Sequence, residues 1–490
     1  MKSSRVQIED SLLIGLLAFA PLALGSVHVW AYCILATLSL IIFDLHFLNN
    51  IDKLKRVLTL PISVGAVAFI GLTCLYVIPF PEYLIKVVTP GAYTLRQTYM
   101  LAPVSWQTIS IYAYPTITSI IKLISYVMVF LVVVSKISLT KNENQAADSS
   151  HPEFVPHTFI LLGALTGVLT IIFHSFSDFN LRIPSNALYF TVFSGIIAGI
   201  GLKKDKSVLN LPFIKKLVNS VIIIGFVVAV FGIIQRFSWN GKIYWLIRKK
   251  GGIFGPFINY DHFAGYMGMC ASLAVAYFMA CIRYSSFFQI KKVKEKLLWF
   301  SSKEANMALI YLFLSTVMIT ALFLTTSRGG ILSFSAAMLV FFFACIVRTK
   351  RKRRSRVVFS ILLIGLLFCV LVIWIGPEPT VERFRMLNRM TKVVIKEKPI
   401  LSEIRPLIWK DTLKVIKDYP VTGTGMGTFS YIFPKYRSFR ADDKNLKYAH
   451  SDYLQLVSET GIFGLVFAIG FLLWYLKMFG RCLRGLREQE

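Results

Sequence analysis

Three basic side chains in the C-terminal half of the chain could together act on a substrate that carries phosphate: Arg328, Arg405 and His450. Guanidinium groups bind a diphosphate through paired hydrogen bonds and balance its charge. A histidine can take the proton from an incoming hydroxyl group. This combination favours a transfer reaction in which a hydroxyl group attacks and a diphosphate leaves.

Arg328 stands in the run Thr325–Gly330 (TTSRGG), where a predicted membrane helix reaches its outer end. A guanidinium group at membrane depth is costly, so it is a candidate for function. The alternative is a side chain that reaches up to the lipid headgroups. The two glycines after Arg328 would allow a bulky ligand to come close, which favours the functional reading.

Arg405 precedes Pro406 and a predicted helix over Leu407–Asp418. Proline suits the first turn of a helix. Arg405 would therefore lie near a helix N-terminus, where an anion also meets free backbone N–H groups. An ordinary surface arginine is the alternative that the spacing leaves open.

His450 precedes Ser451 and Asp452, either of which can cap a predicted helix over Tyr453–Thr460. The positive end of that helix would favour the neutral imidazole, which can accept a proton. The alternative is a loop histidine without a chemical role. His262, in another predicted external segment, is a second candidate for the same role.

The predicted external segments contain neither paired carboxylates nor the spacing of metal ligands, so we expect a reaction without a metal ion or cofactor. The run Gly423–Gly427 (GTGMG) resembles a phosphate-binding loop only superficially. It does not follow a strand of a βαβ unit, and it is therefore predicted to be a tight turn after a helix.

The elements that must position these residues are membrane helices. The 490 residues are 56% hydrophobic and 16% charged, with a mean hydropathy of +0.64. Many apolar runs approach ~20 residues, the length that crosses a bilayer as a helix, and the short alternating segments of a membrane β-barrel are not present. The sequence predicts an all-α polytopic membrane protein with about twelve transmembrane helices. These helices are predicted over Ser11–Gly25, Val29–Phe43, Val57–Ile78, Ile111–Ser135, Val155–Phe173, Ala187–Leu202, Leu217–Ile234, His262–Ile282, Met307–Thr325, Ile331–Val347, Val357–Ile375 and Ile462–Phe479.

Three parts follow from this pattern. Residues 1–376 hold all but the last predicted helix with short loops, 377–459 form a long, partly helical external loop, and 460–490 hold the last helix and a basic tail. We expect the external loop to carry the chemistry.

The net charge of +29 suggests nucleic-acid binding at first sight. Much of the Lys and Arg, however, lies just beyond predicted helix ends, as the positive-inside rule expects. The run Arg348–Arg356 (RTKRKRRSR) is the clearest case, and it also suits anionic lipid headgroups. We therefore predict no nucleic-acid partner and place both termini in the cytoplasm. Arg248 and its lysine neighbours fall on the external side, where they could attract an anionic substrate.

These motifs resemble those of the O-antigen ligase/polymerase superfamily of bacterial membrane glycosyltransferases. The residues that carry the resemblance are Ser327-Arg328-Gly329, Arg405 with Trp409, Pro420 with Gly423–Gly427, Tyr436-Arg437, and His450–Gln455 (HSDYLQ) with Glu459–Gly461. The run Gly255–Tyr266 is similar to a motif of one branch of the family. Ser451 stands where relatives often have Asn. The Ser175–Asn186 turn resembles a segment that many relatives carry near the C-terminus.

The resemblance implies an inverting, metal-independent transfer of a glycan from undecaprenyl diphosphate at the outer face of the bacterial plasma membrane. Arg328 and Arg405 would bind the diphosphate, and His450 would be the base. Further substrate-binding candidates are His262, Arg248, Tyr436 and Arg437.

Two functions in this family remain open, and they differ in the acceptor of the glycan. A polymerase would use a second lipid-linked glycan, and a ligase would use a lipid A core or another acceptor. We favour the polymerase. A transporter or flippase of lipid-linked sugars is the alternative from a different class. It would be expected to show related halves and polar residues at the bilayer midplane, and the sequence has no clear internal repeat.

Overall fold

The structure is a computed structural model of the chain, and it describes residues 2–48, 50–99, 105–138, 156–202, 209–248, 252–349, 354–375, 404–439 and 446–488. Outside these residues lie the polar run at 139–151, the lysine-rich run at 203–206, the centre of the basic run at 350–353, and 376–403 and 440–445 of the long external loop.

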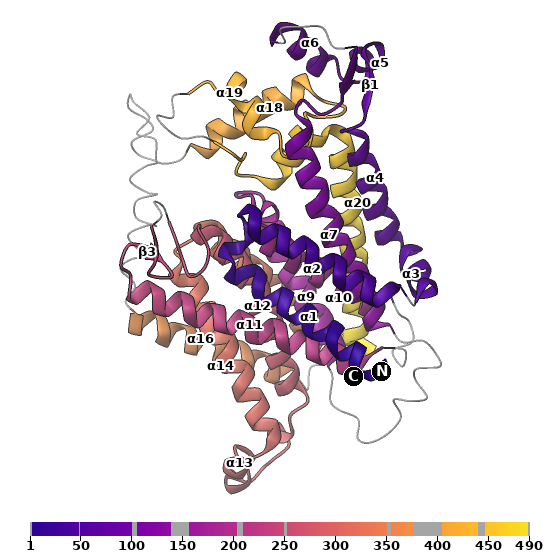
Figure 1. Cartoon of the computed structure of the whole chain (residues 1–490). Coiled ribbons are helices and arrows are strands. Elements are labelled where there is room, and N and C mark those ends of the chain that lie inside the picture. The colour runs from indigo at the N-terminus through magenta and orange to yellow at the C-terminus, as the bar shows by residue number, and fades with distance from the viewer. Residues whose placement is uncertain are drawn as a thin grey trace, which may run out of the picture.

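Each predicted span corresponds to a long helix (Figure 1). These helices are α1 (Lys2–Leu22), α2 (Val29–Phe47), α4 (Pro61–Leu75), α7 (Ala113–Ile137), α9 (His157–His174), α10 (Pro184–Gly201), α11 (Leu211–Phe237), α12 (Tyr260–Arg283), α14 (Lys303–Leu324), α15 (Arg328–Arg348), α16 (Arg354–Ile375) and α20 (Asp452–Glu488). Eight of the described helices are long and apolar enough to cross a membrane, or up to nine if one bent pair is a single span. The set does not include α1, α10 and α16. The all-α membrane class is confirmed, whereas length and composition do not establish twelve spans.

One predicted boundary is wrong. The span predicted from Val57 begins instead at Pro61, because α3 (Ile51–Leu58) is a separate helix that meets α4 at an angle of 89°. Pro61 lies in the first turn of α4. A proline there has no N–H to donate backwards, so the preceding helix cannot continue through it.

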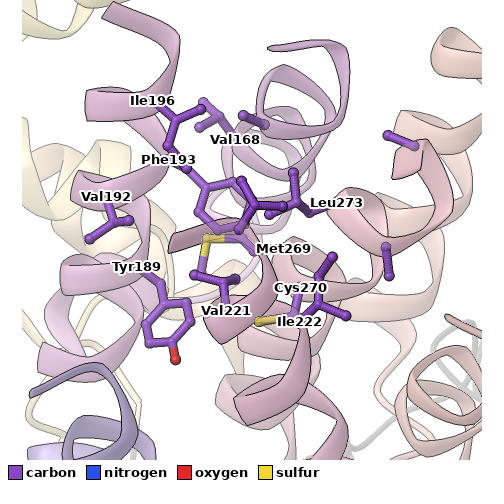
Figure 2. Packing of buried hydrophobic residues seen from close by; sticks show 14 of the residues in the cluster. Val168, Tyr189, Val192, Phe193, Ile196, Val221, Ile222, Met269, Cys270 and Leu273 are labelled. Atoms are coloured by element: carbon purple, nitrogen blue, oxygen red, sulfur yellow. The ribbon is translucent and has the colours of Figure 1, made fainter. Parts of the chain in front are cut away.

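The core is built around α12, which is almost entirely enclosed by neighbouring helices such as α9 and α14. Figure 2 shows Phe193 of α10 packed among Val168, Met269 and Leu273. Gly167 makes this contact possible, since a Cβ there would lie 2.6 Å from the Phe193 ring. Small residues that let membrane helices approach closely are typical of such packing.

The bundle has two distinct ends. The first and last described residues lie close together at one end (Figure 1). At that end the Arg283 guanidinium donates to Thr349 Oγ1 at 2.8 Å, and Arg356 Nη1 donates to the Arg283 carbonyl at 2.8 Å. We call this the basic end. The starts of α12, α15 and α20 lie at the opposite end. The two termini thus share one end of the bundle, and its assignment to the cytoplasm stays a prediction.

A layer of short elements covers the end opposite the basic end (Figure 1). It contains β1 (Pro79–Pro81), α5 (Glu82–Val88), α6 (Pro90–Tyr99), β2 (Trp106–Thr108), α18 (Arg405–Asp418) and α19 (Phe429–Tyr436). The strands β1 and β2 pair antiparallel. The Tyr419 hydroxyl donates to the Gly91 carbonyl at 3.3 Å, which joins α18 to α6. The segment at 79–110 therefore packs on the long loop.

The remaining short elements lie in connections between the long helices. They are η1 (Leu24–Ser26), η2 (Asn180–Arg182), the hairpin of β3 (Lys242–Ile243) and β4 (Ile247–Arg248), η4 (Ser286–Phe288) and α13 (Val293–Trp299).

Candidate active site

Asp261 joins three helix N-termini at the covered end of the bundle. It lies in the first turn of α12 and is buried. Its Oδ2 accepts a hydrogen bond from Arg405 Nη2 at 3.0 Å, and its Oδ1 accepts one from Ser327 Oγ at 2.5 Å. Ser327 also caps α15, since its hydroxyl accepts the Gly330 N–H at 3.1 Å. Arg405 is thereby brought to the start of α15, where Arg328 is the first helical residue.

The glycines after Arg328 serve packing. A Cβ on Gly329 would lie 2.7 Å from Ser177 Oγ and 3.1 Å from the His174 ring. A Cβ on Gly330 would lie 2.5 Å from that of Ala264. The prediction that these glycines leave room for a ligand is therefore wrong, because helices α9 and α12 occupy that space.

A buried carboxylate, Asp178, lies between two histidines. Its Oδ1 lies 3.5 Å from His450 Nδ1, and its Oδ2 lies 3.4 Å from His262 Nδ1. The ring of Phe179 packs edge-on against both imidazoles, with ring centroids 5.0 Å and 4.6 Å away. Burial opposes ionisation of Asp178, but the histidines, His262 above all, outweigh it and hold the pKa of Asp178 well below its usual range. Asp178 is therefore an anion at neutral pH.

His450 is held in a strained backbone conformation, with a φ of 50°. Such left-handed residues are uncommon outside glycine and gather at functional sites. Trp409 Nε1 donates to the His450 carbonyl at 3.2 Å, and the N–H of Ala449 donates to Gln455 Oε1 at 3.1 Å. Helices α18 and α20 thus fix the turn from both sides. Because Nδ1 faces Asp178, Nε2 is the nitrogen that can meet a substrate.

The group around Asp261, with Arg405 and Ser327, adjoins the group around Asp178, with His450 and His262. His174, at the end of α9, is fully buried beneath the start of α15. It interacts electrostatically with Asp178 on one side and with Asp261 and Arg405 on the other. The structure therefore brings Arg405, the start of α15 and His450 into one region, which is the arrangement that the sequence predicted for Arg328, Arg405 and His450.

Sequence reasoning did not identify Asp178 or Asp261 as site residues. Asp261 directly precedes the candidate His262, and Asp178 is the one acidic residue of the Ser175–Asn186 turn. An acidic residue in a short turn between two apolar helices is costly to bury without a partner. That cost was the available signal, and only the fold shows which basic side chains are the partners.

Three further candidates lie away from this cluster. Arg248 is exposed on the β3–β4 hairpin. Arg437 is exposed after α19. The Tyr436 hydroxyl donates to Asp418 Oδ2 at 2.6 Å, at the C-terminal end of α18. Arg405 starts that helix, so Tyr436 is ~20 Å from it along the helix axis. These residues are not gathered with His450, whereas His262 is.

The glycine-rich run Gly423–Gly427 is a turn, as predicted, and Glu459 holds it. Glu459 is fully buried and accepts the N–H of Gly427 at 2.9 Å and that of Phe429 at 3.4 Å. Its Oε2 also pairs with Arg182 Nη2 at 2.7 Å. The turn, α19 and the segment after α9 are therefore joined at one buried charge.

Replacing Glu459 with alanine is expected to destabilise the folded chain by about 3–5 kcal/mol, the usual cost of removing one partner of a buried ion pair. Arg182 would lose its partner, and two backbone N–H groups would lose their acceptor. The thermal unfolding midpoint of the purified chain in lipid nanodiscs measures the effect. Glu295→Ala, at an exposed carboxylate, is the control. An equal midpoint for both variants would show that the ion pair is not what holds the turn.

The chemically active groups at this site are the imidazoles of His450 and His262, the carboxylates of Asp178 and Asp261, and the guanidinium of Arg405. Within the described ranges, no group of three or more His, Cys, Asp or Glu side chains is arranged to hold a metal ion. The chemistry that the gathered side chains can supply is proton transfer at histidine and anion binding at arginine.

Residues 313–469 match a family model described as O-antigen ligase. This match supports membership in the O-antigen ligase superfamily. The matched segment includes Arg328, Arg405 and His450. A comparison with curated proteins found no match.

The acidic partners of these residues lie N-terminal to the matched segment. Asp178 follows α9 and Asp261 begins α12, so the candidate site is built both from the segment that matches the O-antigen ligase model and from the part of the chain before it. The family indicates a membrane enzyme of the glycosyltransferase type. The apolar helices of this chain agree with a multi-pass bacterial membrane protein.

Proposed function

We propose that the protein transfers a glycan from undecaprenyl diphosphate to a sugar hydroxyl group at the outer face of the bacterial plasma membrane. The observation that carries the proposal is the meeting of Arg405, the start of α15 and the Asp178–His450 pair at one end of the bundle. In this proposal the loop at 377–459 supplies the base and one arginine, and the helices at 1–376 supply Arg328 and the groove for the lipid tail. The last helix and the basic tail, 460–490, return the chain to the cytoplasm.

The reaction is one displacement at the anomeric carbon of the donor sugar. The acceptor hydroxyl gives its proton to His450 Nε2, and its oxygen forms the new bond to that carbon. The bond from the carbon to the diphosphate oxygen breaks, its electron pair leaves with the diphosphate, and the configuration inverts. Asp178 orients the imidazole and stabilises the imidazolium that forms.

The arginines stabilise the negative charge that develops on the leaving group. Such fixed electrostatic stabilisation is usually the largest single contribution to catalysis. Arg405 suits this role because Asp261 orients its guanidinium, while its side chain keeps 27% exposure. Arg328 is partly buried at the start of α15, where the helix N-terminus also favours an anion.

The proposal includes two reactions that differ in the acceptor. We favour polymerisation, in which a second lipid-linked glycan supplies the hydroxyl group. Ligation to a lipid A core is the second candidate, because the family description names a ligase. Both reactions use the same displacement step. A flippase would not need a base that is oriented by a buried carboxylate.

Arg328→Ala and Arg405→Ala are each expected to lower glycan transfer by about 10²- to 10³-fold, the usual loss when one stabilising donor is removed. The measurement is complementation of a deletion strain, scored by glycan chain length and by protein level in the membrane. Loss of long chains with single units still attached to the acceptor would indicate a polymerase. Accumulation of lipid-linked polymer would indicate a ligase.

Arg484→Ala is the matched control, because Arg484 is an exposed arginine near the basic end. We expect it to complement fully. Normal glycan from well-expressed Arg328→Ala and Arg405→Ala chains would refute the proposed function.

A further inference from the structure

A cavity of about 170 Å³ adjoins the candidate active site. Its walls are the end of α11, the segment 252–260 and the turn between α14 and α15. Tyr260, which lines it, directly precedes Asp261, and Thr326, which also lines it, directly precedes Ser327. The cavity therefore shares a wall with the hydrogen-bonded group that holds Arg405.

Gln235, which lines the cavity, has an unpaired polar atom. Its side chain is 1% exposed, and its Nε2 donates to the Lys242 carbonyl at 3.3 Å. That bond identifies the other end of the amide as the oxygen. Oε1 is buried and has no hydrogen-bond partner among the described residues. Buried polar atoms in folded proteins nearly always have a partner, so Oε1 calls for a donor from a ligand.

The rim of the cavity is aromatic and cationic. Trp239 is 43% exposed there, and Arg236 is exposed beside it. The lining also includes Thr325 and Thr326, so it is polar as well as aromatic. A sugar ring, which has an apolar face and hydroxyl groups around its edge, matches this lining. A lipid tail would leave Oε1 unpaired, and a phosphate group has only acceptor oxygens to offer it.

The cavity has the size of one sugar ring. A water-sized sphere needs ~15 Å³ of such volume, so the cavity has room for on the order of ten non-hydrogen atoms. A single pyranose has about that number.

We propose that this cavity binds one sugar ring of the glycan substrate, with a hydroxyl group of the ring donating to Gln235 Oε1. The inference rests on the proposed function and names a substrate-binding site for it. The ring could belong to the donor glycan, next to the diphosphate, or to the end of the acceptor glycan.

The test uses the full chain in nanodiscs and two variants. Gln235→Leu removes the acceptor oxygen, and Trp239→Ala removes the exposed indole. Dissociation constants are measured for three probes: lipid-linked glycan extracted from the host, the same glycan released from its lipid diphosphate, and undecaprenyl diphosphate alone. Both variants are expected to bind the lipid-linked glycan about tenfold more weakly, the effect of one lost hydrogen bond or ring contact. Both should bind undecaprenyl diphosphate as the wild type does.

The released glycan distinguishes the two sources of the ring. If the variants also bind it more weakly, the cavity holds the acceptor sugar. If only the lipid-linked glycan is affected, the cavity holds the donor sugar. Wild-type affinity of both variants for both glycans would overturn the proposal.

Phe237→Ala is the control, because Phe237 is 65% exposed on the same helix end and does not line the cavity. Gln235→Leu changes a buried side chain and could weaken binding by misfolding. Trp239→Ala changes an exposed side chain, so weaker binding by that variant does not have this explanation. A wild-type chain that does not bind undecaprenyl diphosphate would refute the proposed function, whereas a Gln235-dependent loss of glycan binding would still support the sugar site.

Discussion

Replacing His450 with alanine is expected to slow glycan transfer by about 10²- to 10⁴-fold, the usual contribution of a general base. The acceptor hydroxyl group would then have no positioned group to take its proton. Binding of the donor should change little, because the arginines that meet the diphosphate are intact. The measurement is the initial rate of glycan transfer by the purified chain in nanodiscs, with donor affinity determined in parallel.

The strained backbone of His450 makes a structural explanation worth testing. Alanine at a φ of 50° is no better accommodated than histidine, so the variant could lose activity by relaxing the turn. His450→Asn separates the two causes, since asparagine tolerates left-handed conformations but cannot act as a base. We expect the same loss of rate with a wild-type unfolding midpoint. His28→Ala, at a partly buried histidine before α2, is the control and should be active. A His450→Asn chain with a normal rate would remove His450 from the mechanism.

Hydropathy predicted where the long helices lie, because apolar length is a direct physical requirement for spanning a bilayer. Of the twelve predicted spans, eight or nine correspond to described helices that are long and apolar enough to cross a membrane. Hydropathy could not predict the bend between α3 and α4, where Pro61 rather than apolarity sets the boundary. The helix that starts at Arg405 also followed from sequence. Its side chains Ile408, Val415 and Tyr419 are buried, whereas Ile404 and Leu407, at the same helical spacing, are only partly buried.

The basic residues of the site could be predicted and their acidic partners could not. Arg328 could be noticed because a guanidinium group at membrane depth is costly, and Arg405 and His450 because each lies near a predicted helix N-terminus. Asp261 and Asp178 acquire a role only through pairing with Arg405 and His450, which are 144 and 272 positions away in the chain. Such separations depend on the packing of α9, α12 and the long loop, and local pattern does not encode that packing.

The roles of the glycines show the same limit. Sequence could show that Gly329 and Gly330 permit a close approach, but it could not show what approaches. In the structure the neighbour is helix α9, with the ring of His174 3.1 Å from a Cβ placed on Gly329. Tyr436 was a candidate because of its motif, yet its hydroxyl binds Asp418 within the loop itself.

Replacing Asp178 with asparagine is expected to slow transfer by about 10²-fold or more, because the carboxylate that orients the base would be lost. Asparagine has nearly the same shape but can present its amide N–H to His450 Nδ1. The imidazole proton would then move to Nε2, and that nitrogen could no longer accept the proton of the acceptor. The loss should appear in the rate of transfer, while donor affinity stays near that of the wild type.

The pH profile distinguishes this role from a structural one. The pKa of Asp178 is held well below its usual range, so in the wild type its charge does not change between pH 5 and 8. A change in the rate of transfer within that interval therefore does not come from titration of Asp178 itself. A nearby anion favours the protonated imidazole. Without it the remaining activity should persist to lower pH, so the acid limb of the rate profile is expected to move to lower pH in Asp178→Asn.

Asp418→Asn is the control, because Asp418 is a carboxylate at the far end of α18 that binds a tyrosine hydroxyl and not a histidine. It should keep both the rate and the acid limb of the wild type. His262 also faces Asp178, so His262→Gln tests which histidine depends on the carboxylate. If His450 is the base, His262→Gln should leave the acid limb in place, whereas His450→Asn should abolish it. An acid limb that disappears with His262→Gln and survives His450→Asn would exchange the roles of the two histidines, and Asp178 would then serve His262.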